Sequence, residues 1–177
     1  MLTPNPVQTV YTRYAKVGQV GMPATATGWD IDTRIASDIS SPATGIGFGL
    51  AVSQGNASDR AACLGLLSGG VFVGITCNAI TLPNVTIGFT DVYENGSNMP
   101  VMIRGDIWVN AADAVVAGAP VYFNSVTGAF GASGISNATE IYGARWMTSA
   151  PTASTDLLKV EVGTLAVVRL IGVGPNV

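Results

Sequence analysis

The segment MPVMIRGDIWVN, residues 99–110, alternates apolar and polar side chains with a period of two and so predicts a β-strand. One face of this strand is apolar, with Val101, Ile103, Ile107 and Val109. The opposite face is mainly polar, with Met102, Arg104, Asp106, Trp108 and Asn110. The same alternation returns at residues 158–162, LKVEV, so the chain is predicted to be all-β.

Turn signals separate this strand from its neighbours at short intervals. Asn95-Gly96 predicts a β-hairpin that joins residues 80–93 to residues 99–110, because both residues tolerate positive φ. Gly118-Ala119-Pro120 precedes the strand VYFN, and a further turn follows at residues 126–128. Short strands with frequent turns favour an antiparallel β-sandwich or a small β-barrel.

The remaining segments complete the expected organisation. Residues 164–174, TLAVVRLIGVG, are apolar on both faces apart from Arg169 and predict a buried central strand. Little helix is expected: residues 32–40 and 56–66 could each form one short helix. Residues 1–40 are predicted to form an extended N-terminal arm or edge strand, and residues 41–177 the sandwich or barrel core. A first strand of the protein's own sheet is an equal alternative for the arm.

The composition points to a protein that works in an assembly. Only 11% of the residues are charged and 48% are hydrophobic, whereas about 25% charged residues are usual in soluble domains. We therefore expect partner subunits to cover part of the apolar surface. The net charge is −3 and the eight cations are scattered, so no nucleic-acid partner is expected. The most apolar stretch, residues 61–75, is too short and too interrupted by glycine to span a membrane, and no secretory signal is expected at the start.

No catalytic, metal or cofactor site is predicted. The chain has no histidine, which excludes Ser-His and Cys-His mechanisms, so an enzyme is not expected. Asp30, Asp32 and Asp38 could contribute to a hard-cation site, but the closing glutamate and turn glycine of a calcium loop are missing. An ion pair with Arg34 is the favoured interpretation of this acidic segment.

Two further features have a structural interpretation. Cys63 and Cys77 stand in apolar surroundings and are expected to be buried thiols, although the sequence does not exclude a disulfide. Arg104-Gly105-Asp106 spells a cell-adhesion tripeptide, but it lies inside an alternating strand, and we interpret it as strand sequence.

Four short segments occur in an order that resembles the capsid cement, or decoration, proteins of tailed bacteriophages. These segments are Phe48–Val52, Phe72–Ile75, Gly105–Val109 and Ala117–Tyr122. The resemblance implies a viral structural protein made in the host cytoplasm. It would bind the outer surface of the icosahedral head and stabilise contacts between major capsid subunits. It also implies a homo-oligomer, with a trimer favoured over a dimer.

Contacts with the capsid or with other copies are expected to involve the arm and the first tryptophan. The candidate residues are Tyr11, Tyr14, Val17, Val20, Met22 and Trp29. Aromatic side chains are frequent anchors of protein interfaces, although Trp29 could equally fill the core. Two alternatives remain: a phage tail or fibre subunit, and a sugar-binding β-domain that uses Trp29 with Asp30, or Trp146 with Glu140.

Overall fold

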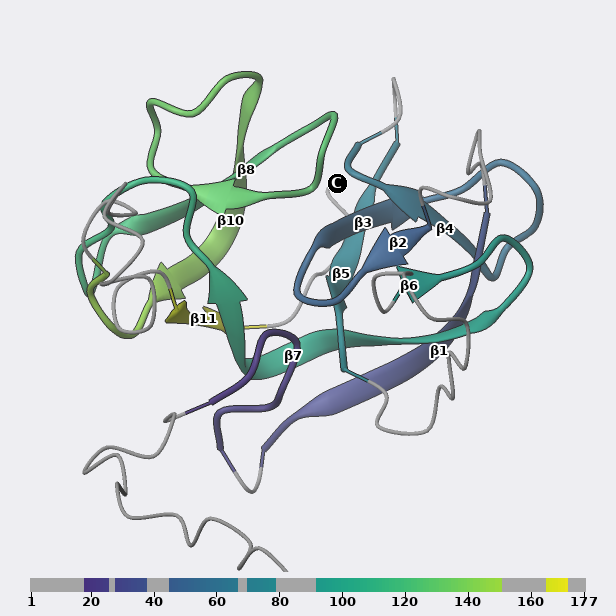
Figure 1. The fold of residues 1–177 in the computed structure, drawn as a ribbon, viewed down its shortest axis with the longest axis horizontal. Coiled ribbons are helices and arrows are strands. Elements are labelled where there is room, and N and C mark those ends of the chain that lie inside the picture. Colours follow the sequence, from purple (N-terminus) through teal and green to yellow (C-terminus); the bar gives the residue numbers. More distant parts are fainter. Residues whose placement is uncertain are drawn as a thin grey trace, which may run out of the picture.

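A computed structural model describes residues 18–25, 28–37, 45–66, 70–78, 92–150 and 165–171. The described elements are all strands (Figure 1): β1 Asp30–Ala36, β2 Ile46–Gly47, β3 Ala51–Gln54, β4 Ala61–Leu64, β5 Phe72–Thr76, β6 Val92–Tyr93, β7 Asn98–Asn110, β8 Pro120–Asn124, β9 Phe130–Gly131, β10 Ala138–Trp146 and β11 Leu165–Leu170. No helix occurs in these ranges, and so none there could cross a membrane. The predicted all-β class is confirmed.

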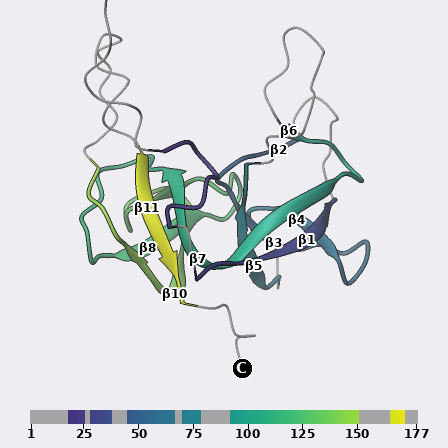
Figure 2. The ribbon, with the colours of Figure 1, turned by 90° about the horizontal axis from the view of Figure 1, so that it is seen from below.

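One nine-stranded sheet, in the order β1-β4-β3-β5-β7-β11-β10-β8-β9, forms most of the fold. An additional pairing of β1 with β7 closes its first five strands into a ring, which makes a small barrel. The other four strands extend the sheet beyond β7, and Figure 2 shows the two parts on either side of that strand. Only β1 and β4 pair in parallel among the described strands. The short strands β2 and β6 form a separate two-stranded sheet.

Strand β7 belongs to both parts, and the faces to which its side chains point are exchanged halfway along it. Its pairing with β1 matches Asp30 to Arg104 and Ile31 to Met102, so Ile103 is an extra residue in a β-bulge. Gly105 follows with φ of 123°, in the region that favours glycine. The prediction that one face of β7 would be continuously apolar was therefore wrong, because the bulge reverses the alternation.

The fold has two separate hydrophobic cores, and strands of the ring contribute to both. The ring core gathers Ala36, Ile46, Val52, Ala62, Tyr93, Met99 and Val101. The larger core lies under the extended sheet and includes Phe72, Ile75, Met102, Ile107, Val109, Phe123, Phe130, Trp146 and Val168. Phe72 and Phe123 are in contact there, with ring centroids 5.5 Å apart, so the outside of the ring packs against β8.

The expected central strand at the C-terminal end is confirmed, because β11 lies between β7 and β10. The two expected short helices are wrong in their described parts. Residues 32–36 belong to β1, and Ala61–Leu64 form β4. Both segments are placed between ring strands, where ladder hydrogen bonds and burial outweigh a weak helix propensity.

The expected hairpin around Asn95-Gly96 is correct only at its turn. Gly96 has φ of 83°, and Ser97 N donates a hydrogen bond to Glu94 O at 3.0 Å. The strands on either side do not pair with each other: β6 pairs with β2, whereas β7 pairs with β1. The first half of β7 pairs with β1, which closes the ring, and so β6 does not pair with it as a hairpin would require.

Candidate functional site

Residues 18–25 lie along the second half of β7. Gly21 N donates to Trp108 O at 2.8 Å, Trp108 N donates to Met22 O at 3.0 Å, and Ala24 N donates to Asp106 O at 2.7 Å. Pro23 forms an isolated antiparallel bridge with Ile107. This part of the predicted arm therefore adds to the protein's own sheet. The division at residue 40 stays a prediction.

The predicted contact residues in the described ranges are Val20, Met22 and Trp29. Val20 is half-buried and its side chain packs against Gly49. Met22 is 47% exposed and Trp29 is 41% exposed, so both present apolar surface to a partner. The backbone of Trp29 lies so close to Gly105 that a Cβ there would meet it at 2.9 Å. Tyr11, Tyr14 and Val17 lie outside the described residues.

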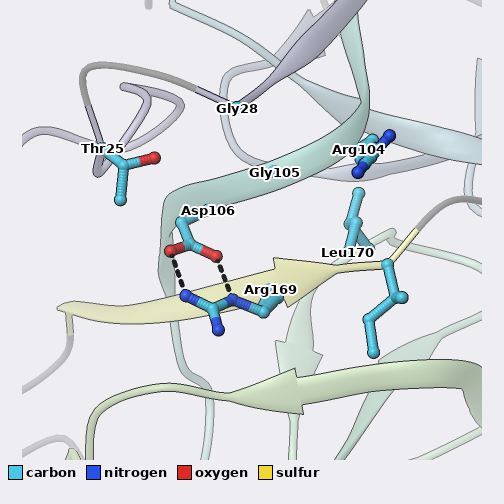
Figure 3. Close-up of a pocket in the computed structure, with 8 residues that line it drawn as sticks. Thr25, Gly28, Arg104, Gly105, Asp106, Arg169 and Leu170 are labelled. Atoms are coloured by element: carbon cyan, nitrogen blue, oxygen red, sulfur yellow. Dashed lines mark hydrogen bonds and ion pairs between the residues drawn. The ribbon is translucent and has the colours of Figure 1, made fainter.

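A recess of about 270 Å³ opens between Gly28 and the strands β7 and β11 (Figure 3). Its lining includes Arg104, Gly105 and Asp106 from β7, and Arg169 and Leu170 from β11. Arg169 donates two hydrogen bonds to Asp106, from Nε to Oδ1 at 2.7 Å and from Nη2 to Oδ2 at 2.8 Å. Asp106 is only 7% exposed, and its bonds and charge raise the pKa of Arg169 above its ordinary value.

Arg104 and Arg169 line the recess, and Arg145 lies opposite Arg169 in the sheet; we call these three residues the arginine row. Arg169 lies directly opposite Asp106 on β7 and directly opposite Arg145 on β10. Opposite residues of antiparallel strands project from the same face. Arg145 is exposed and donates to the neighbouring Ala144 O at 3.0 Å. Within the described residues, Arg104 is exposed and has no ion pair.

Tyrosines extend this face beyond Arg145. Tyr122 Oη donates to Glu140 Oε2 at 3.3 Å, and the two residues are opposite each other on β8 and β10. Partial burial and then the charge of Glu140 raise the pKa of Tyr122. Between Glu140 and Arg145 the register shifts, and Tyr142 projects there with 78% of its surface exposed. Bulges often redirect a side chain, and aromatic side chains are frequent anchors of protein interfaces.

The other sequence candidates have structural roles. Asp32 lies 2.9 Å from Arg34, as the ion-pair interpretation predicted, and no metal-binding group of side chains occurs in the described ranges. Asp38 lies outside those ranges. Asp106 of the Arg-Gly-Asp tripeptide is buried in β7, which confirms the strand interpretation. Trp146 is 1% exposed, so it cannot serve as the sugar platform suggested for it. Cys63 and Cys77 are buried free thiols.

Sequence reasoning did not place Arg145, Arg169 and Tyr142 on one outer face of the sheet. Their proximity depends on which strands are neighbours in the sheet, and the alternation within one strand carries no such information. The only available signal was Arg169 itself, a charge inside an otherwise apolar central strand.

Comparison with known proteins gives a structure of similar fold and a protein family. A search of curated proteins found no match. The solved structure described as "The capsid of Myoviridae Phage XM1" contains a chain with a similar fold. Its TM-score is 0.62 at 15% identity, and the alignment covers 95% of this chain and 99% of that one. A family model described as structural cement protein (E217 gp24/Pam3 gp6) matches residues 7–171. Since this match spans nearly the whole sequence, the chain belongs to the phage structural cement protein family.

Proposed function

We propose that this capsid structural protein binds the outer surface of the phage head and clamps neighbouring major capsid subunits together. Membership of the cement family carries the proposal. A subunit that binds the assembled shell and not its separated parts stabilises the shell by mass action. The low charge of the chain, 11% of residues, also suits a protein that buries much of its surface against partners.

The proposed contact surface runs along β7 and includes Val20, Met22 and Trp29. The backbone of Met22 is bonded to Trp108 of β7, and an exposed apolar side chain held in this way loses little entropy on binding. The proposal also includes Tyr11, Tyr14 and Val17 of the arm as contacts with the capsid or with other copies. A homotrimer is the proposed oligomer, since several weak contacts around one axis add up to lasting attachment.

The first prediction concerns binding to expanded capsids that lack the cement protein. Purified protein is expected to co-sediment with these capsids and to raise their temperature of thermal disruption. Trp29→Ala should weaken binding roughly tenfold or more, because large aromatic anchors dominate interface energies.

Val126→Ala is the matched control, since Val126 is 65% exposed on the β8–β9 turn, away from β7. It should bind like the unchanged protein. Absence of binding by the unchanged protein, or no gain in capsid stability, would refute the proposed function.

A further inference from the structure

The arginine row has an arrangement that costs stability within the chain. Arg145 and Arg169 are direct cross-strand neighbours, and like charges in such positions repel each other. Asp106 is bonded to Arg169 through both carboxylate oxygens and so does little to neutralise the charge of Arg145. The carboxylate of Glu140 accepts a bond from Tyr122, and the charge of Arg145 acts on the same tyrosine.

The charges that line the recess run against the charge of the whole chain. Arg104 and Arg169 line it with one carboxylate, that of Asp106, which leaves one positive charge (2 − 1 = 1). Over the whole face the charges balance, because Asp30 lies directly opposite Arg104 and joins Asp106 and Glu140 as a third carboxylate. The full chain has a net charge of −3. A local excess of cations in an acidic protein marks a surface that is complementary to an anionic group.

The recess is a hollow on this surface into which a side chain of a partner can enter. Arg104 and Arg169 both line it, and one carboxylate side chain fits easily within about 270 Å³. Arg169 uses Nε and Nη2 for Asp106, so its third nitrogen, Nη1, remains for an incoming acceptor. The Asp106 carboxylate holds that guanidinium in place before any partner arrives, which lowers the entropic cost of the new contact.

From these observations we infer that the arginine row is a docking site for aspartate or glutamate side chains of the major capsid protein. The inference rests on the proposed function, and it adds the chemistry of the partner. A nucleic acid is the weaker candidate, because an acidic chain repels an extended polyanion, whereas a single carboxylate meets only the local positive charge. Tyr142, beside the row, would pack against the partner and exclude water.

The test compares Arg104→Gln and Arg145→Gln with Arg60→Gln in binding to expanded, cement-free capsids. Arg60 is also an exposed arginine, but it lies by β1, where it bonds to Thr33 O at 3.1 Å. All three variants lose one positive charge. Arg104→Gln and Arg145→Gln should each weaken capsid binding roughly tenfold at about 0.1 M salt, and Arg60→Gln should change it less than about twofold.

A thermal melt separates docking from a structural role. Removing the repulsion between Arg145 and Arg169 should leave the Tm of Arg145→Gln equal to that of the unchanged protein or above it. A clear fall in Tm would assign Arg145 to the stability of the fold and overturn the inference. As a probe of partner chemistry, poly-L-glutamate should compete with capsids for the unchanged protein, and a short DNA duplex should not. Competition by the duplex alone would also overturn the inference.

The two proposals fail in different ways. If the unchanged protein does not bind the capsids, the proposed function is wrong. If it binds, and Arg104→Gln and Arg145→Gln bind as well as Arg60→Gln, only the docking role of the arginine row is wrong.

Discussion

At the residue scale, Cys77 shows how burial changes the chemistry of a single group. It belongs to the larger core, and its backbone oxygen accepts a hydrogen bond from Tyr93 Oη at 2.6 Å. Burial raises the pKa of the Cys77 thiol from 9.0 to about 12, despite an opposing backbone hydrogen bond from Met102. The folded state therefore holds the thiol proton more tightly than the unfolded chain does.

This linkage predicts a loss of stability in alkaline solution. Below pH 9 the thiol is protonated in both states, so its contribution is fully present; it is lost as the pH rises from 9 toward 12. The free energy of unfolding of the unchanged protein, compared with that of Cys77→Ala, should fall by roughly 1 kcal/mol per pH unit in this window. Urea titrations of both proteins at several pH values measure the difference. A constant difference from pH 8 to pH 11 would contradict the prediction.

Residue properties that depend on composition were the easiest to predict from the sequence. Both cysteines stand among apolar neighbours, and both are buried. Asp106 was harder, because its place in the alternation predicted a solvent-facing side chain. Only the register of β11 against β7 places Arg169 opposite it and allows its burial as an ion pair.

At the scale of elements, β7 depends on Gly105. This residue combines φ of 123° with close packing, since a Cβ would lie 2.6 Å from Trp29 Cβ. Periodicity correctly predicted a strand over this segment, but it could not predict the change of face. The bulge at Ile103 lies where β7 leaves its pairing with β1 and begins its pairing with β11, and one strand's alternation does not reveal its neighbours.

Gly105→Ala should therefore destabilise the protein by roughly 2–4 kcal/mol, through backbone strain and displacement of Trp29. Gly143→Ala is the matched control, because Gly143 has φ of 82° but nothing within 4 Å of its added Cβ. Its expected cost is about 1 kcal/mol, from strain alone. Urea unfolding followed by tryptophan fluorescence gives both values, and equal costs would show that packing at Gly105 contributes nothing.

At the scale of the whole molecule, the two cores are joined by shared strands. β3, β5 and β7 each contribute side chains to both: Ala51, Ile75 and Met102 face the larger core, whereas Val52, Val73 and Val101 face the ring core. Neither core can lose its packing without exposing strands of the other. The sequence predicted a barrel or a sandwich as alternatives, and it could not indicate that one strand would belong to both a ring and an open sheet.

The shared strands predict a single cooperative unfolding transition. In differential scanning calorimetry the isolated protein should show one peak, with a calorimetric enthalpy equal to the van't Hoff enthalpy. Two resolved peaks, or a ratio of these enthalpies well above one, would show that the ring and the extended sheet unfold independently.

The position of β11 in the sheet also governs the order in which the fold can form during synthesis. This strand lies between β7 and β10, and it is the last of the described strands in the sequence. Until residues 165–170 leave the ribosome, β7 and β10 have no central partner, and the larger core lacks Ala166, Val168 and Leu170. Contacts between distant parts of a chain also form slowly. The larger core of a nascent subunit therefore remains incomplete until β11 has been synthesised, which delays the appearance of the Arg169 surface until then.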